Sequence, residues 1–122
     1  MDRLWFFYLN KEIGHRHAKR YPDIQQWEGL LERAGFKIVS VTSVMQKFPP
    51  STVEAIADPE GPTKKEWRDC NSYWASATPE ELAEIEKEIG RLKEEGKLEQ
   101  FVKDNDKSKG YYQLTFIFSK AI

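Results

Sequence analysis

Residues 22–45, PDIQQWEGLLERAGFKIVSVTSVM, have a pattern that predicts a helix followed at once by a strand. Asp23 is placed to cap the start of the helix, and Gln26 can reach back to it. Gly35 can end the helix in the left-handed conformation. The β-branched run from Lys37 to Val44 then predicts a partly buried strand. The apolar stripe of the helix has three- and four-residue steps and consists of Ile24, Trp27, Leu30, Leu31 and Ala34.

The strongest strand pattern runs from Tyr111 to Ser119, where side chains of opposite character alternate. We expect it to pair antiparallel with the first strand. The main core is then predicted where Leu114, Phe116 and Phe118 pack on Trp27, Leu30 and Leu31. A two-stranded sheet is marginal by itself. A third strand that the pattern does not reveal, a second chain or a separate half of the protein is therefore expected to complete it.

The clearest helix begins after Thr78, where Thr-Pro-Glu-Glu supplies an N-cap, a first-turn proline and two acids. Its core stripe consists of Leu82, Ile85, Ile89 and Leu92. Upstream, residues 47–62 are rich in proline and predict a surface connection with one short turn. Thr63 and Glu66 could form a capping box for a short helix over 64–69. Residues 98–102 predict another short amphipathic turn, and 104–110 a polar loop.

Trp5, Phe6, Phe7 and Tyr8 make the N-terminus unusually aromatic. We expect a helix over residues 4–20, weakened in its middle by a glycine. Four adjacent aromatic side chains cannot all point into one small core from a regular helix. The sequence therefore predicts that some of them contact another chain, in a dimer or an extended interface.

Composition narrows the classes of function. The 122 residues fit one domain, and 19 basic against 20 acidic residues leave a formal charge of −1. This balance gives no general attraction for nucleic acid or an anionic membrane. The single cysteine, Cys70, excludes an intrachain disulfide and a zinc cluster of thiolates. Because neither a secretory signal nor a long apolar run is visible, we expect a cytoplasmic protein without a membrane span.

The helix–AGF–strand unit of residues 22–45, taken with the C-terminal YYQLTFIFSK, resembles the end of a class I S-adenosylmethionine-dependent methyltransferase. The middle segment, DPEGPTKKEWRDCNSYWASATPEEL, is similar to insertions that help cover the acceptor substrate in such proteins. The resemblance implies the C-terminal part of a Rossmann-like α/β fold, which is α+β as an isolated chain. The expected order is helix, strand, helical insertion and antiparallel final strand.

Within one domain spanning 1–122, this order places an aromatic and basic segment at 1–21 and the helix–strand unit at 22–45. The insertion occupies 46–110, with its helix at 79–95, and the final strand 111–120. The glycine-rich turn that holds the cofactor in these enzymes is missing, because the seven glycines are isolated. We therefore expect no cofactor in this chain alone, and S-adenosylmethionine only if a cofactor-binding half is joined to it.

The resemblance places the N-terminal segment and the insertion near the acceptor. The acceptor-side candidates are Trp5, Tyr8, Arg16, His17, Tyr73 and Trp74. Each of these residue types is individually more often structural, and aromatics of the insertion more often pack than line a pocket. His15 and His17 are not expected to bind a metal, because side chains two apart on a helix point in different directions. No catalytic residue and no metal site is predicted.

Two functions remain open at this point. In the first, the chain is an acceptor-side domain that contributes to methyl transfer onto a small molecule only with its cofactor-binding half, and is inactive alone. In the second, it is a noncatalytic α+β interaction module, expected to form a homo-oligomer. A hydrolase or nuclease has little support, because the sequence contains no nucleophile elbow or paired-carboxylate motif.

Overall fold

The structure is a computed structural model that describes residues 3–122. In chain order its helices and strands are α1 (Lys11–Ala18), α2 (Ile24–Arg33), β1 (Phe36–Lys47), α3 (Pro50–Ala57), α4 (Lys65–Asp69), α5 (Pro79–Glu94), α6 (Leu98–Asn105) and β2 (Tyr111–Ala121). Three short 3₁₀ helices, η1 (Trp5–Leu9), η2 (Gly61–Thr63) and η3 (Ser72–Ser76), complete the described elements.

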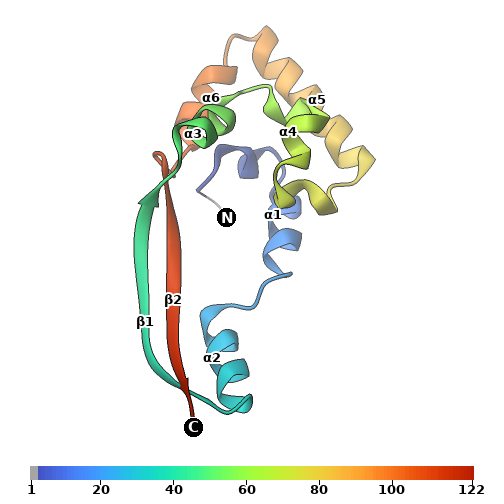
Figure 1. Ribbon diagram of the computed structural model, residues 1–122. Helices are drawn as coiled ribbons and strands as arrows, with labels where there is room; N and C mark the ends of the chain where they lie inside the picture. The colour runs from blue at the N-terminus through green and yellow to red at the C-terminus, as the bar shows by residue number, and fades with distance from the viewer. Residues whose placement is uncertain (1–2) are drawn as a thin grey trace.

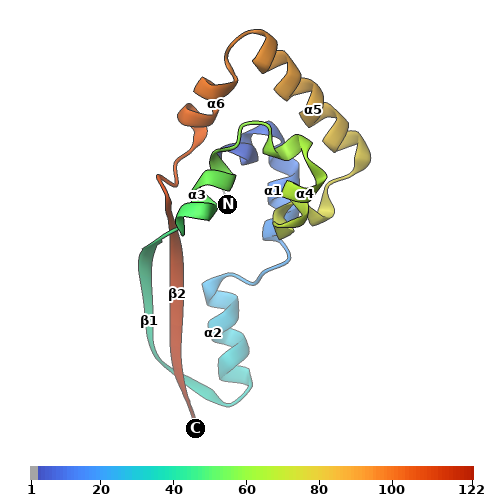
Figure 2. The same cartoon turned by 45° about the horizontal axis from the view of Figure 1, so that its top comes forward.

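The chain folds into two parts that extend in opposite directions (Figure 1). We call the upper part the helical body; it contains η1, α1 and everything from α3 to α6. The lower part, the arm, consists of β1, β2 and α2. Turning the molecule keeps this division visible, with the C-terminus at the far end of the arm (Figure 2). The described residues thus form a mixed α+β chain with six α-helices and one two-stranded antiparallel sheet.

The antiparallel pairing of the two predicted strands is confirmed. Their register runs from Phe36 opposite Ala121 to Lys47 opposite Tyr111, and a bulge at Val39 interrupts it. Both strands are longer than their sequence patterns predict. No third strand joins them in residues 3–122.

The predicted helix ends are largely confirmed. Asp23 and Gln26 form both hydrogen bonds of the capping box at the start of α2. Gly35, just after α2, has a φ of 92°, in the left-handed region that favours glycine. Thr78 caps α5 by accepting from the backbone N–H of Glu81. These helix ends depend on hydrogen bonds and backbone angles of residues close together in the sequence, so the sequence can predict them.

Three local predictions were wrong. Residues 47–62 contain a two-turn helix, α3, which starts with a proline in its first turn, where the missing N–H costs no helical hydrogen bond. The N-terminal helix is divided at Asn10, which caps α1 by accepting from Glu12, so that the aromatic residues lie in η1 instead. Thr63 also does not cap α4; its hydroxyl donates to the carbonyl of Glu60.

The core lies in the helical body, and the N-terminal aromatics are at its centre. Trp5 and Phe6 are almost fully buried and Phe7 is buried. The other buried apolar residues are Ile13, Tyr73, Trp74, Ile85, Ile89, Leu92 and Leu98. The expectation that the N-terminal aromatics need another chain was therefore wrong for these three. They can all be buried because elements of the body surround the short η1 helix on several sides.

The predicted main core between the final strand and α2 was also wrong. Phe116 is 45% and Phe118 is 54% exposed, and Trp27 of α2 is 47% exposed. Their apolar patterns are real, but within this chain the arm supplies too few elements to cover them. Most of the exposed large apolar side chains are thus on the arm. No helix in residues 3–122 has the length and apolar character needed to cross a membrane.

Candidate functional site

The contact between α1 and η3 brings together three of the six predicted acceptor-side residues: His17, Tyr73 and Trp74. His17 lies in the last turn of α1. Asn71 starts η3 by accepting a hydrogen bond from the backbone N–H of Tyr73, at 2.9 Å. The His17 and Tyr73 ring centroids are 5.8 Å apart, and those of Tyr73 and Trp74 are 5.0 Å apart. Local capping thus places residues from distant parts of the sequence against each other.

Gly14, one helical turn before His17, permits the close approach of Tyr73. A Cβ atom at Gly14 would lie 3.2 Å from the Tyr73 hydroxyl oxygen and 2.4 Å from a ring carbon of Phe7. A larger residue would force both rings away from α1. The glycine that weakens the helix in isolation is therefore required by the packing of this site.

Four buried polar atoms of α1 and η3 have no hydrogen-bond partner in the described chain. They are His17 Nδ1, Tyr73 Oη, Trp74 Nε1 and Ser76 Oγ, and we call these four residues the His17–Tyr73 cluster. Leaving such a group without a partner costs about 1–3 kcal/mol. Buried polar groups in native proteins are nearly always satisfied, by protein, ordered water or ligand. These four residues thus carry polar atoms that no side chain or backbone group of the described chain satisfies.

Burial sets the charge state of the cluster. It lowers the pKa of His17, and the nearby positive charge of Arg20 lowers that pKa further. Burial alone raises the pKa of Tyr73 well above its ordinary value. At neutral pH the cluster thus holds a neutral imidazole, which can accept a proton, and a neutral phenol, which can donate a hydrogen bond.

Arg16 does not point into this cluster as a binding cation. Its guanidinium donates to both carboxylate oxygens of Glu81, at 2.8 and 2.6 Å, and to the carbonyl of Ser76, at 3.1 Å. The hydrogen bond to Glu81 is the main cause that raises the pKa of Arg16. Arg16 thus ties α1 to the start of α5 and to η3, and it supports the cluster from outside.

The other two predicted residues belong to different contacts. Trp5 is completely buried, and its indole N–H donates to the carbonyl of Ile56 in α3, at 2.6 Å. Tyr8 accepts a hydrogen bond from the ammonium of Lys107, at 2.6 Å. The structure thus brings His17, Tyr73 and Trp74 together, with Arg16 beside them. Trp5 and Tyr8 form their hydrogen bonds at other places in the helical body.

Sequence reasoning missed two members of this region. Ser76 contributes one of the unpartnered atoms, and the Tyr21 ring lies 5.2 Å from the His17 ring. No motif distinguishes either residue, because their roles arise from how η3 and the end of α1 meet. Only the three-dimensional contact identifies them.

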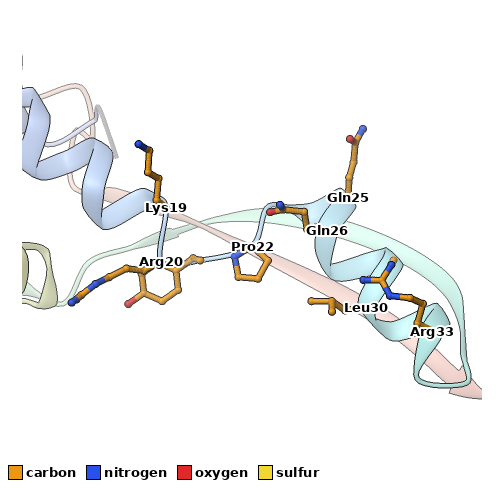
Figure 3. Close-up of a pocket in the computed structure, with 9 residues that line it drawn as sticks. Lys19, Arg20, Pro22, Gln25, Gln26, Leu30 and Arg33 are labelled. Atoms are coloured by element: carbon orange, nitrogen blue, oxygen red, sulfur yellow. The ribbon is translucent and has the colours of Figure 1, made fainter.

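An open cleft of about 410 Å³ lies next to this region, between the end of α1 and α2. It is lined by Lys19, Arg20, Tyr21, Pro22, Gln25, Gln26, Gly29, Leu30 and Arg33. Figure 3 shows that the charged ends of Lys19, Arg20 and Arg33 point in different directions. The cleft is therefore a shared boundary of body and arm, without converging cations that would hold an anion.

The described residues offer no structure of the kind that binds a dinucleotide-like cofactor. The glycines with positive φ are Gly35, Gly96 and Gly110, and they follow α2, follow α5 and precede β2. The strand-to-helix connection after β1 runs through Phe48 and Pro49. Residues 3–122 also contain no group of three or more His, Cys, Asp or Glu that could hold a metal ion.

Comparisons with protein-family models, with curated proteins and with solved structures gave no match to this chain.

Proposed function

We propose that this chain is the acceptor-side domain of a methyltransferase-like protein. It contributes to methyl transfer from S-adenosylmethionine to a small-molecule acceptor only when a cofactor-binding half is joined to it, and it is inactive alone. The proposal has its origin in the resemblance of residues 22–45 and 111–120 to the end of such enzymes. The observation that supports it best is the two-stranded sheet of the arm, which the described chain leaves incomplete.

The two strands of the arm carry apolar side chains on both faces. Residues that pair across the ladder share a face, so Phe116 lies with Thr42 on one face, and Val41 lies with Ile117 on the other. Apolar residues on both faces are typical of a sheet covered by helices on both sides. Among the helices of the described chain, α2 makes the main contact with this sheet, and it does so through β1. An α/β half with further strands and helices would complete it.

The His17–Tyr73 cluster supports the acceptor side of the proposal. Methyl transfer depends mainly on aligning the acceptor with the sulfonium methyl group, sometimes with a base that removes a proton. In this proposal the neutral imidazole of His17 accepts the proton of the acceptor, and the Tyr73 hydroxyl orients it. Arg16 ties α1 to η3 through the Ser76 carbonyl and to α5 through the Glu81 ion pair, and so holds the elements that carry both groups.

Calorimetric titration with S-adenosylmethionine tests the proposal. The chain alone should not bind the cofactor measurably, because its described residues provide no glycine-rich turn. The coding sequence directly upstream of the first codon should contain an in-frame glycine-rich strand-to-helix motif, and the joined polypeptide should bind with micromolar affinity. Micromolar binding by the chain alone, or the absence of such a motif, would contradict the proposal.

A second candidate, a noncatalytic interaction module that forms a homo-oligomer, is favoured by the same exposed arm. Long apolar strand edges tend to associate. Sedimentation over a wide range of concentrations separates the candidates. The interaction module should form a defined dimer, whereas the acceptor-side domain alone should not form a single defined oligomer.

A further inference from the structure

A mostly apolar pocket of about 270 Å³ lies between α3 and α4 in the helical body. Ser51, Thr52 and Ala55 of α3 line it, and these small side chains leave the space between the two helices unfilled. An apolar cavity of roughly 150 Å³ is enough to hold benzene. The pocket therefore has room for a molecule of one or two fused rings.

Trp67 of α4 gives this pocket an aromatic side that is held in place by its neighbours. The indole N–H of Trp67 donates to the carbonyl of Ala55, at 2.7 Å. Its ring packs edge-to-face on Phe6, with centroids 5.5 Å apart, and its centroid is 5.9 Å from that of Trp74. A Cβ atom at Gly61 would lie 2.4 Å from a carbon of this ring, so the chain also packs closely there. A side chain that is already fixed loses little freedom when a ligand packs on it.

The last turn of α3 is fixed by two indole groups. The indole N–H of Trp5 donates to the carbonyl of Ile56, at 2.6 Å, and that of Trp67 donates to the carbonyl of the preceding residue. Trp5 is completely buried in the core. These two hydrogen bonds position α3 against the core and against α4, so the pocket between the two helices is a fixed feature of the fold.

The lining of the pocket determines the charge of its ligand. None of its lining residues within 3–122 is charged, whereas Lys19, Arg20 and Arg33 line the cleft beside α2. A charged group in the pocket would lose water without gaining an opposite charge in return. The ligand that fits this lining is therefore uncharged.

Polar groups of the pocket indicate that the ligand carries a hydroxyl group. The side-chain oxygen of Asn71 accepts from the backbone N–H of Tyr73, so the NH₂ group of Asn71 can donate to a ligand oxygen. Ser51 and Thr52 add two hydroxyls, each of which can donate or accept. A few polar groups in a mainly apolar lining are typical of small-molecule sites.

We propose that the pocket between α3 and α4 binds a small uncharged aromatic molecule of one or two fused rings that carries a hydroxyl group. Its ring packs against Trp67, and its hydroxyl forms hydrogen bonds with Ser51, Thr52 or Asn71. The inference goes beyond the proposed function, because it requires neither methyl transfer nor a second half. All the residues that line the pocket belong to this chain.

Nuclear magnetic resonance of the ¹⁵N-labelled chain tests the inference with three matched probes. 2-Naphthol is aromatic and uncharged at pH 7, 2-naphthoate carries a negative charge on the same rings, and decahydro-2-naphthol has the hydroxyl without the aromatic rings. 2-Naphthol should shift the indole N–H signal of Trp67 saturably. Its affinity should exceed that of 2-naphthoate by about tenfold and that of decahydro-2-naphthol by about threefold.

A pair of leucine variants supplies the control. Ala55→Leu fills the pocket from α3 and should weaken the binding of 2-naphthol by at least about tenfold. Ala83→Leu introduces the same side chain in α5, away from the pocket, and should leave the affinity unchanged. Both alanines are exposed on helices, and unchanged signals outside the altered helix will verify folding.

Cys70 gives a second measure of occupancy. It is the single cysteine of the chain, it is exposed, and it lines the pocket. Bound 2-naphthol should slow the alkylation of Cys70 by iodoacetamide in the original chain, and the same concentration should have little effect in Ala55→Leu.

Several results would overturn the inference. These are no saturable binding of 2-naphthol, equal affinity for 2-naphthoate or for decahydro-2-naphthol, full binding in Ala55→Leu, and alkylation of Cys70 at an unchanged rate. Binding of N-acetyltryptophanamide without binding of 2-naphthol would mean that the pocket receives an aromatic side chain of another protein, and the inference would then be wrong. None of these results bears on the proposed function, which titration with S-adenosylmethionine tests separately.

Discussion

The ring of Phe7 lies directly against Gly14 of α1, so close that a Cβ atom on the glycine would be 2.4 Å from a ring carbon. Gly14 and the ring are both buried, which leaves the ring no open space into which it could move. The helix therefore accepts the entropic cost of a glycine in its middle so that the core can pack closely.

Replacement of this glycine should destabilise the protein. Gly14→Ala gains about 1 kcal/mol of helix propensity, but overpacking a core costs about 1–3 kcal/mol, so we expect a net loss of stability of up to about 2 kcal/mol. Gly90→Ala is the matched control, because nothing lies within 4 Å of its Cβ position in α5. It should stabilise by about 0.5–1 kcal/mol. Urea denaturation measures both, and a change of the same sign in the two variants would contradict the packing argument.

The location of the core makes opposite predictions for two phenylalanines. Phe6, only 1% exposed, packs on Trp67, Tyr73 and Trp74, and Phe6→Ala should cost about 3–5 kcal/mol. Phe116, 45% exposed on the arm, should cost about 1 kcal/mol or less when changed to alanine. The midpoints of chemical denaturation measure both effects. A large loss of stability in Phe116→Ala would mean that the main core lies in the arm.

Local chemistry explains which features of the fold the sequence could predict. The capping box at Asp23, the left-handed Gly35 and the Thr78 cap depend on neighbours in the chain, and each is found as predicted. The alternation in β2 also identified a real strand. The pattern could not say what each apolar face contacts, because that depends on residues far apart in sequence. Phe116 and Trp5 both have apolar neighbours in the sequence, yet Trp5 is buried and Phe116 is exposed in the fold.

The candidate site shows the same limit. His17, Tyr73 and Trp74 were predicted from segments that the family resemblance brought together, and the structure does place these three in contact. Arg16 is engaged by Glu81, 65 residues away, and no short-range pattern indicates that pair. Ser76 joins the cluster only because η3 turns toward α1. A sequence motif records residue types at fixed spacing, whereas these contacts depend on how two separate helices meet.

Protonation of His17 should destabilise the fold. Burial lowers the pKa of His17 below its ordinary value of 6.5, so the unfolded chain binds a proton more readily than the folded chain. Stability then rises with pH in this range. The stability that neutral His17 contributes is complete above about pH 6.5. It is lost as pH falls from there toward the lowered pKa of His17 in the folded state.

Chemical denaturation between pH 5 and 8 tests this dependence. His17→Gln should flatten the part of the stability curve below the ordinary histidine pKa, whatever its effect on stability at pH 8. His15→Gln, at an exposed position of the same helix, is the control and should keep the shape of the original curve. An unchanged shape in His17→Gln would mean that another group causes the dependence.

The arm should open more easily than the helical body, although its two strands are hydrogen-bonded to each other. Protection of a backbone amide reflects the free energy needed to expose it, and regions with few buried apolar contacts open locally at low cost. Ile85 and Ile89 of α5 are each 2% exposed, whereas Val41 in β1 is 40% exposed. Hydrogen exchange of the dilute chain should therefore be at least about tenfold faster for the central amides of β1 and β2 than for those of α5.

Small additions of urea distinguish local from global opening. Exchange in α5 should accelerate steeply, because it requires unfolding of the whole body and exposes much surface, while exchange in the arm should change little. Equal protection and equal urea dependence in β2 and α5 would mean that the arm and the body unfold as one unit. That result would require the exposed residues of the arm to be covered in solution. Repeating the measurement at lower protein concentration would then show whether a second copy covers them, because only an intermolecular contact weakens on dilution.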